Sequence, residues 1–264
     1  MTGYDDDLRL AHVLADQADS LTMQRFKALD LKVETKPDLT PVSDADKATE
    51  ELLRTTLSRS RPRDAVIGEE YGDTPGNSGA TRRRWVIDPI DGTKNYVRGV
   101  PVWATLIALM EGPTPVVGVV SAPALGRRWW ASKSGGAYSG RSLSSATRLS
   151  VSKVKVLEDA SFAYSSVISW EEDGKLDGFL TLSRACWRTR AYGDFWSHMM
   201  VAEGSVDLAA EPEVSLWDMA AIAVIVTEAG GQFTATDGDP SPAAGSACTS
   251  NGLLHDALLA HLGD

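Results

Sequence analysis

Cysteine and long apolar runs are both scarce in this sequence, and each scarcity excludes a class of protein. Two cysteines, Cys186 and Cys248, are too few for the disulfide framework of a small secreted domain. No apolar stretch is long enough to cross a bilayer. The N-terminal segment MTGYDDDLRL lacks the basic and apolar regions of a signal peptide. We therefore expect a soluble cytoplasmic protein with no membrane partner.

Basic residues are in the minority. Lys and Arg number 26 against 36 Asp and Glu, which gives a net charge of −10. Nucleic-acid binding depends on contacts between phosphates and basic side chains, so no nucleic-acid partner is expected. The same charge would repel a phosphorylated metabolite unless cations lie between the two.

Apolar spacing predicts a mixture of helices and strands. Leu10, Leu14, Ala18 and Leu21 recur at helical spacing, so an amphipathic helix is expected from about residue 5 to 28. Ser43 has the character of an N-cap for a second helix, which begins with DADKATEELLRTTL. Strands are expected in the apolar segments VIGEE, RRWVID, ATLIALM, PVVGVVSAP and RRWWAS.

The pattern of elements changes near residue 150. Residues 1–150 are predicted to form an α+β half, because their strands follow one another without long helices between them. We expect an antiparallel sheet there, with helices on one side. In residues 151–264 short strands alternate with helical stretches near 177–185, 193–202 and 218–229, which indicates an α/β half. We place a boundary near Ser150, although no obvious linker marks it.

Acidic side chains stand at the ends of several predicted elements. Asp88 and Asp91 end the buried strand in WVIDPIDGTKNYVRGVP, Glu69 follows the strand in VIGEEYG, and Asp218 lies in the first turn of an apolar helix. The 4 His residues are scattered along the chain. An all-oxygen ligand set selects Mg²⁺ or Mn²⁺ over Zn²⁺. Several converging carboxylates would hold more than one ion, an arrangement used for in-line displacement at phosphorus.

Gly92 and Thr93 follow the acidic pair directly. If a helix starts after Asp91, the free N–H groups of both residues suit a phosphate oxygen. The Thr93 hydroxyl could orient a water molecule, and Asp44, at the start of the second helix, is the candidate to take its proton. Lys94 could lie near the phosphate or point to solvent. Simpler explanations exist, because Asp-Gly is common in hairpin turns and an acidic residue at a helix start can merely complement the helix dipole.

Three motifs carry a resemblance that covers nearly the whole chain. GEE at residues 68–70, WVIDPIDGTKNYVRGVP at 85–101 and WDMAAIAVIVTEAGG at 217–231 resemble the inositol monophosphatase family of metal-dependent, lithium-sensitive phosphatases. The resemblance implies a layered αβαβα sandwich of the inositol monophosphatase and fructose-1,6-bisphosphatase type, and a homodimer. It also implies two or three Mg²⁺ ions, which Mn²⁺ can replace, and inhibition by Li⁺.

Carried over position by position, the resemblance implies a complete active site. The implied metal ligands are four carboxylates and one backbone carbonyl: Glu69, Asp88, Ile90, Asp91 and Asp218. Asp88 would bridge two ions, and Gly92 and Thr93 would hold the phosphate. Thr93 and Asp44 would help to activate the attacking water, and Glu69 would steady that water or a further metal. The implied reaction is hydrolysis of a small phosphate monoester.

In this family the second half of the chain selects the leaving alcohol, and here it is acidic. Asp194 stands where inositol-directed members carry a small or hydroxyl residue, and Glu211 offers a second carboxylate, so a cationic leaving group is favoured. RAYGDF, AAEPEVSLWD and TSNGLLHD most resemble the actinobacterial branch that hydrolyses histidinol phosphate in histidine biosynthesis. Asn251 would bond the imidazole of histidinol. The full set of expected substrate contacts is Gly92, Thr93, Gly193, Asp194, Phe195, Glu211 and Asn251.

Three alternatives stay open. Asp194 could form a salt bridge with Arg188 or Arg190 instead of contacting the substrate. Inositol monophosphate and 3′-phosphoadenosine 5′-phosphate are competing substrates. A metal-binding regulatory protein without catalysis is the alternative outside enzymes, although such a protein would be expected to have lost one of the carboxylate ligands or Thr93, and none is lost.

Overall fold

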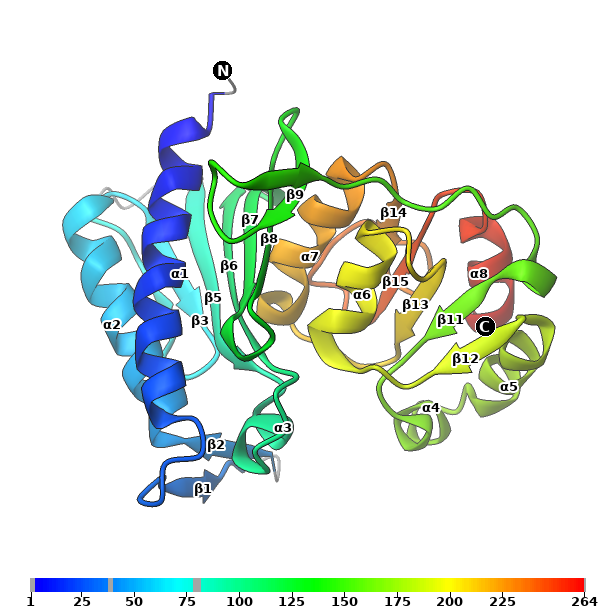
Figure 1. The fold of residues 1–264 in the computed structure, drawn as a ribbon, viewed down its shortest axis with the longest axis horizontal. Helices are drawn as coiled ribbons and strands as arrows, with labels where there is room; N and C mark the ends of the chain where they lie inside the picture. The colour runs from blue at the N-terminus through cyan, green and yellow to red at the C-terminus, as the bar shows by residue number, and fades with distance from the viewer. Residues whose placement is uncertain (1–2, 38–39, 78–81, 264) are drawn as a thin grey trace.

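The computed structural model describes residues 3–37, 40–77 and 82–263, and within them the elements form five layers (Figure 1). A helix pair covers an eight-stranded sheet, a second helix pair separates that sheet from a five-stranded one, and further helices close the far side. This order of layers is the predicted αβαβα sandwich.

The first helix layer and a small hairpin come from the N-terminal segment. The layer contains α1 (Asp5–Arg25) and α2 (Asp44–Ser60), which pack against each other. The hairpin lies between them and contains β1 (Val33–Thr35) and β2 (Pro41–Ser43). The side chain of Ser43 caps α2 as its sequence position predicts, by accepting a hydrogen bond from the Ala45 N–H.

The large sheet has the strand order β10-β9-β8-β7-β6-β5-β3-β4. Its neighbouring strands are antiparallel except for the β3–β5 pair, which is parallel. The strands are β3 (Ala65–Gly68), β4 (Gly72–Thr74), β5 (Arg83–Asp91), β6 (Ala104–Glu111), β7 (Thr114–Ala122), β8 (Arg127–Ser132), β9 (Gly136–Gly140) and β10 (Ala146–Arg148). Two short helical segments interrupt this series, namely α3 (Thr93–Val97) and the 3₁₀ turn η1 (Pro123–Leu125).

The second helix layer lies between the two sheets. It contains α6 (Asp194–Ala202) and α7 (Leu216–Glu228), and α7 packs on strands of both sheets. The helices α1 and α2 of the N-terminal half lie on one face of the large sheet as expected, and α7, which belongs to residues 151–264, covers the other face. Nearly every residue of α7 after its first turn is buried, and each fully buried aliphatic side chain contributes about 1.5–3 kcal/mol.

The five-stranded sheet has the order β12-β11-β13-β15-β14 and is covered on its outer face by helices of the last layer. β11 runs parallel to both β12 and β13, whereas β15 is antiparallel to its two neighbours. The strands are β11 (Ser161–Ala163), β12 (Arg188–Arg190), β13 (Leu208–Glu211), β14 (Gln232–Thr234) and β15 (Ala247–Ser250). The outer helices are α4 (Val167–Glu172), α5 (Leu176–Ala185) and α8 (His255–Leu262).

The segment around residue 150 connects the sheets. β10 ends at Arg148, and β11 begins at Ser161 after the 3₁₀ turn η2 (Leu157–Asp159). One buried apolar cluster contains Val120 from the large sheet together with Phe195 and Ile222 from the central helices. The division into halves near Ser150 stays a prediction. Among the described residues, none of the helices combines the length and apolarity needed to cross a membrane.

Candidate functional site

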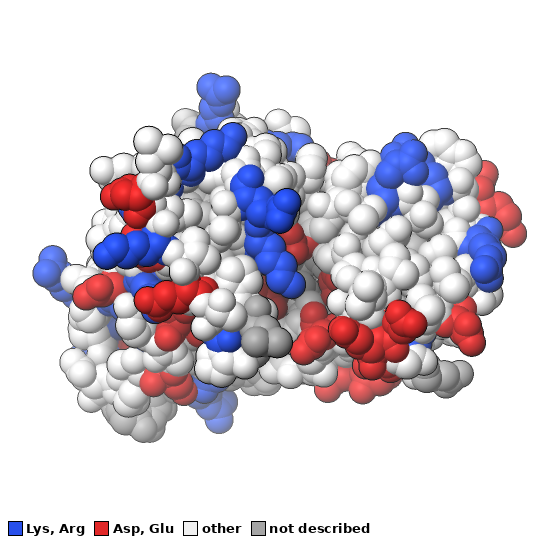
Figure 2. Space-filling model, turned by 90° about the horizontal axis from the view of Figure 1, so that it is seen from below, with Lys and Arg blue, Asp and Glu red and all other residues white. Residues whose placement is uncertain are grey.

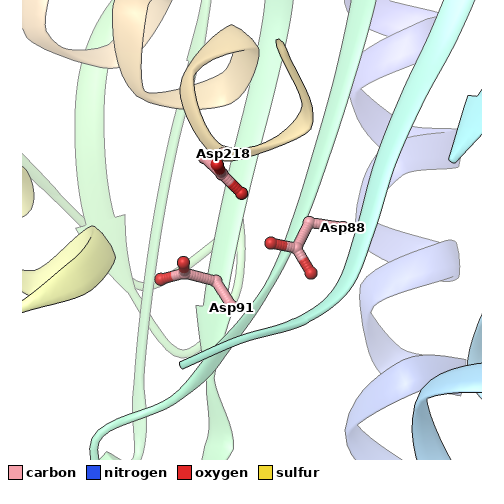
Figure 3. Close-up of side chains that lie close together, drawn as sticks. All are labelled: Asp88, Asp91 and Asp218. Carbon is pink, nitrogen blue, oxygen red and sulfur yellow. The ribbon is translucent and has the colours of Figure 1, made fainter. Parts of the chain in front are cut away.

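Asp88 and Asp91 lie together because the strand that carries them is irregular. In a regular strand, residues three positions apart point to opposite faces. The pairing of β5 with β6 matches Asp88 to Leu106 and Asp91 to Ala104, with a shift of register between them. An irregularity of this kind re-aims side chains. The Asp88 carboxylate also accepts a hydrogen bond from the Ile90 N–H at 2.9 Å. Both carboxylates consequently face the same space (Figure 3).

The third carboxylate comes from the first turn of α7. Asp218 closes a capping box with Ser215, whose backbone N–H donates to Asp218 Oδ2 at 2.7 Å. One oxygen each of Asp88, Asp91 and Asp218 lies within 4.8 Å of the other two, and the three groups face one another in Figure 3. Burial of α7 between the sheets fixes the place of Asp218, so the fold itself assembles this cluster.

Burial and mutual repulsion oppose ionisation of the cluster. Burial, with repulsion from Glu69, raises the pKa of Asp88 well above its ordinary value. Burial also raises the pKa of Asp91, with repulsion from Asp194 and Asp218, and it raises the pKa of Asp218 to about 7. Oxygen donors held this close, without sulfur or imidazole among them, fit a hard divalent cation. A cation of that kind would relieve the repulsion.

Glu69 stands beside this cluster, at the end of β3. Its Oε1 accepts a hydrogen bond from Lys36 Nζ at 2.7 Å, and the same ammonium donates to Glu70 Oε1 at 2.7 Å. Burial raises the pKa of Glu70 to about 7, although Lys36 counteracts this. The hairpin of β1 and β2 therefore places a cation on the acidic turn, a contact that the sequence motifs do not indicate.

A buried carboxylate of α2 holds the turn that carries Glu69. Glu50 is fully buried and accepts hydrogen bonds from the backbone N–H groups of Glu70 at 2.7 Å and Tyr71 at 3.2 Å. Arg54, one helical turn later, donates to Glu50 at 2.7 Å. A side chain at Gly68 would overlap the Glu50 carboxylate, so glycine is required there. Glu50 is thus a positioning residue for Glu69 that sequence reasoning missed.

The carboxylate next to Thr93 is Asp46, and the prediction of Asp44 is wrong. Thr93 Oγ1 lies 3.2 Å from Asp46 Oδ1 and 2.9 Å from the Ile90 carbonyl oxygen, to either of which its proton can be donated. Asp44 instead accepts a hydrogen bond from Arg25 at 2.8 Å. Two residues along a helix differ by about 200° in direction, so the two side chains cannot share a face.

Asp46 was overlooked although the sequence carried a signal for it. Ser43 and Asp46 have the S-x-x-D spacing of a capping box, and Asp46 Oδ2 accepts hydrogen bonds from Ser43 N at 2.8 Å and Ser43 Oγ at 2.5 Å. These bonds turn the Asp46 side chain back over the start of α2, towards Thr93. Burial raises the pKa of Asp46 to about 6.

The first turn of α6 connects the cluster with the expected leaving-group side. The Phe195 N–H donates to Asp91 Oδ2 at 2.8 Å, while the Phe195 ring is buried in the core. The Gly193 N–H donates to Ser197 Oγ at 3.0 Å. The structure therefore brings the Phe195 backbone to the site, whereas the Phe195 side chain points away from it and the Gly193 N–H is bonded within α6.

Asp194 faces α3 and makes no salt bridge with the two arginines considered above. Asp194 Oδ2 accepts a hydrogen bond from Asn95 Nδ2 at 3.1 Å. Arg188 donates to the Tyr192 hydroxyl, and Arg190 to the Thr189 carbonyl. Burial raises the pKa of Asp194. The carboxylate is consequently held near α3 by Asn95, and the charge of Lys94 offsets part of the effect of burial on its pKa.

Glu211 is buried directly behind Asp194. Ser165 Oγ joins the two residues, because it donates to Glu211 Oε1 at 2.5 Å and accepts from the Asp194 N–H at 2.8 Å. Burial raises the pKa of Glu211 to about 8, with a contribution from the charge of Asp194. The structure therefore brings the two predicted recognition residues together.

Asn251 lies elsewhere, and the predicted contact with an imidazole is wrong. Its amide nitrogen donates to Ser152 Oγ at 2.9 Å and to the Val154 carbonyl at 2.8 Å. Its amide oxygen accepts from the N–H groups of Leu253 and Leu254. All of these bonds hold a turn of the C-terminal segment together, which leaves no free group for a ligand.

A cleft of about 340 Å³ opens onto the site. Figure 2 shows the molecule hollowed between its two parts, with acidic side chains gathered along one rim. Sequence reasoning had not included Glu213 and Trp217 of this wall. The described residues that line the cleft are Thr40, Pro41, Glu69, Gly92, Thr93, Lys94, Asp194, Glu213, Val214, Ser215, Trp217 and Asp218.

Comparison with known proteins agrees with this geometry. The model of the inositol monophosphatase family matches residues 5–264. The chain belongs to this family. It is 72% identical over 266 residues to a histidinol-phosphatase of Streptomyces coelicolor, covering 99% of this chain and 98% of that protein. It is 56% identical over 257 residues to a histidinol-phosphatase of Mycobacterium tuberculosis, with 97% and 98% covered.

Solved structures of the family have the same fold. An inositol monophosphatase from Zymomonas mobilis superposes with a TM-score of 0.86 at 30% identity, covering 99% of both chains. The extragenic suppressor protein SuhB from Bartonella henselae superposes with a TM-score of 0.88 at 26% identity, covering 98% of both. The predicted fold and family are thereby confirmed, and the protein is a phosphomonoesterase of a metal-dependent family.

The raised pKa values predict how the metal-free protein responds to pH. Carboxyl groups of an unfolded chain titrate near pH 4, whereas those of Asp218 and Glu211 have pKa values of about 7 and about 8 in the fold. The folded state therefore holds more protons between these values, and stability falls as the pH rises through them. We expect Tm to fall by at least about 5 °C from pH 5.5 to 8.5.

Magnesium should remove the part of this pH dependence that comes from Asp218, which is a proposed metal ligand, and leave the part that comes from Glu211. Glu211→Gln is the matched variant, because it deletes one of the titrating groups and should flatten the profile in metal-free buffer. If the Tm of the metal-free protein stayed constant or rose from pH 5.5 to 8.5, the raised pKa values of these buried carboxyl groups would be contradicted. The measurement is thermal unfolding in EDTA and in Mg²⁺.

Proposed function

We propose that this protein hydrolyses L-histidinol phosphate to L-histidinol and phosphate, with Mg²⁺ as the preferred ion. The observation that carries the proposal is the position of Asp194. Asp194 Oδ2 lies 3.2 Å from the point where a Cβ atom on Gly92 would stand. A carboxylate therefore adjoins the backbone that directly follows Asp91 of the carboxylate cluster. The two closely similar proteins named histidinol-phosphatase support the same substrate.

The residues proposed to hold metal are those that the family motifs imply: Glu69, Asp88, Ile90, Asp91 and Asp218. When bound there, Mg²⁺ supplies Lewis-acid polarisation of the phosphoryl group and acidifies a water molecule. Two or three ions, replacement by Mn²⁺, inhibition by Li⁺ and a homodimer are further parts of this proposal. The Ile90 carbonyl oxygen lies 2.9 Å from Thr93 Oγ1, and it has two lone pairs, so at least one can face a ligand whichever acceptor takes the Thr93 proton.

Thr93 and Asp46 are proposed to handle the proton of the attacking water. The Thr93 hydroxyl can accept a hydrogen bond from water while donating to Asp46 Oδ1. With a pKa of about 6, the Asp46 carboxylate is largely ionised at neutral pH and can act as the acceptor of that chain. Gly92 has φ 81°, a conformation that favours glycine, and its N–H is proposed to bind the phosphate together with that of Thr93.

The chemistry of histidinol phosphate matches the position of Asp194. Its ammonium group is carried by the carbon next to the ester CH₂, so this charge must lie within a few ångströms of the phosphate. Asp194 adjoins Gly92, and Glu211 lies behind it through Ser165. Asp194 is half-buried and forms no ion pair among the described residues, so it gains from an ammonium ligand and gives specificity against neutral alcohols. A polyol such as inositol offers no such charge.

Asp194→Asn tests the leaving-group assignment. The amide keeps the shape and can still accept the Asn95 hydrogen bond, but it removes the charge. We expect kcat/KM for histidinol phosphate to fall at least about 30-fold, since truncating one side of a buried charge pair costs about 2–5 kcal/mol. The kcat/KM for glycerol 2-phosphate should change by less than about threefold, because this substrate has no cation for Asp194 to bind. An equal loss of kcat/KM with both substrates would show that Asp194 does not recognise the leaving group.

Assays of the parent enzyme discriminate between the candidate substrates. Mg²⁺-dependent phosphate release should give the highest kcat/KM with histidinol phosphate in a panel that also contains inositol 1-phosphate and 3′-phosphoadenosine 5′-phosphate. A higher value for either competitor would overturn the proposed substrate while leaving the phosphatase class intact. Absence of any release with the whole panel would favour the metal-binding regulatory alternative.

A further inference from the structure

The cleft wall contains one basic side chain among its described residues. Four of the lining residues are acidic, and Lys94 is the basic one. A phosphate monoester carries about two negative charges at neutral pH. A cleft with this lining would repel such an ester over most of its surface, so the single ammonium has a large influence on where an anion can rest.

Lys94 is free to bind a ligand. It is exposed, and in the described part of the chain it takes part in no ion pair and no side-chain hydrogen bond. Lys36, the other lysine near the cluster, is occupied by Glu69 and Glu70. The charge of Lys94 lowers the pKa of Asp194 against the effect of burial. Asp194 already has a hydrogen-bond partner in Asn95.

The helix that carries Lys94 is firmly anchored. Tyr96 is buried, and its hydroxyl donates to the Thr22 carbonyl at 2.7 Å. Asn95 Nδ2 donates to the Val102 carbonyl at 3.0 Å and also to Asp194. The backbone of Lys94 is therefore held in place directly beside Thr93, and its side chain is flexible. A lysine suits this place because its ammonium binds phosphate as a point charge and can follow the anion as it moves.

We propose that Lys94 is a phosphate-binding residue of this enzyme, whose ammonium contacts an oxygen of the substrate phosphate and of the phosphate product. The inference rests on the proposed function only in requiring a phosphate monoester in the cleft. It does not depend on which alcohol leaves. The competing role for Lys94 is an ion pair with Asp194, which would instead weaken the recognition of a cationic leaving group.

The test measures three quantities in Lys94→Gln, Lys94→Arg and the parent enzyme with Mg²⁺: KM for histidinol phosphate, KM for glycerol 2-phosphate and Ki for inorganic phosphate. Loss of a hydrogen bond to a charged group should raise all three by about tenfold in Lys94→Gln. Because ground state and transition state lose the same contact, kcat should change by less than about threefold. Lys94→Arg should stay within about threefold of the parent in all three.

A matched control comes from the same helix. Arg98 is exposed at the C-cap of α3 and does not line the cleft, so Arg98→Gln removes an equal charge without touching the site. It should leave all three constants near the parent values. An unchanged Ki for phosphate in Lys94→Gln would overturn the proposal. A change of KM confined to histidinol phosphate would also overturn it, because it would indicate that Lys94 acts through an ion pair with Asp194. Neither result bears on the substrate ranking of the parent, which tests the proposed function separately.

Discussion

Asp91→Asn is expected to lower kcat at least about 1000-fold with every phosphate monoester, because the loss of about 4 kcal/mol of charge stabilisation in the transition state corresponds to that factor. Asp91 lies within 4.8 Å of both other carboxylates of the cluster, so it is placed to share any ion held there. An amide oxygen is a weaker ligand for a hard cation than a carboxylate. The measurement is phosphate release at saturating histidinol phosphate and saturating Mg²⁺.

The same variant should be well folded. The amide that replaces the Asp91 carboxylate retains an oxygen for the Phe195 N–H bond, which Asp91 accepts at 2.8 Å. The change also removes one of three mutually repelling charges, so Tm in EDTA should equal or exceed that of the parent. Binding of Mn²⁺, followed by electron paramagnetic resonance, should weaken in parallel with activity. Parent-like turnover would refute the metal assignment, and loss of activity with unimpaired Mn²⁺ binding would refute the role given to Asp91.

The fold could be predicted as far as local patterns and motifs reach. Helical spacing placed α1, the N-cap at Ser43 placed α2, and apolar runs placed β5 to β8, all within a few residues. The helix layer on the second face of the large sheet comes from residues beyond 150, and only the family resemblance predicted it, although the sequence carried a local sign of it. ATLIALM is a continuous apolar run, and all of its residues in β6 are buried. Strands of that kind are typically covered on both faces, so this run agrees with the second helix layer that the resemblance implies.

Site residues that belong to a sequence motif could be predicted. Contacts between residues far apart in the sequence could not. The carboxylates of β5 and α7 belong to long specific motifs. Glu50 and Lys36 bond to the turn after β3 from 20 or more positions away, and no spacing reveals such contacts. The prediction for Asn251 was wrong for a different reason. It follows a strand end as ligands often do, but local turn bonds use both ends of its amide.

Asp44 and Asp46 form a natural pair of variants with opposite expectations. Asp46→Asn should lower kcat by about 100-fold or more, the contribution typical of a positioned proton acceptor. The reason is that Asp46 Oδ1 is the carboxylate oxygen next to Thr93 Oγ1, whereas Asp44 is paired with Arg25. Asp44→Asn should therefore stay within about threefold of the parent in kcat, since it alters only a partly exposed ion pair.

The comparison is sharp because both changes are isosteric and lie in the first turn of one helix. The amide oxygen introduced by Asp46→Asn would still accept the Ser43 N–H bond that caps α2, so a small change in Tm is expected for both variants. Their kcat values, measured with Mg²⁺ at saturating substrate, then report the position of the proton acceptor rather than helix stability. If Asp44→Asn were the more damaging variant at equal Tm, Thr93 would exchange its proton with Asp44 in the working enzyme, and the hydrogen bond to Asp46 would have no part in catalysis.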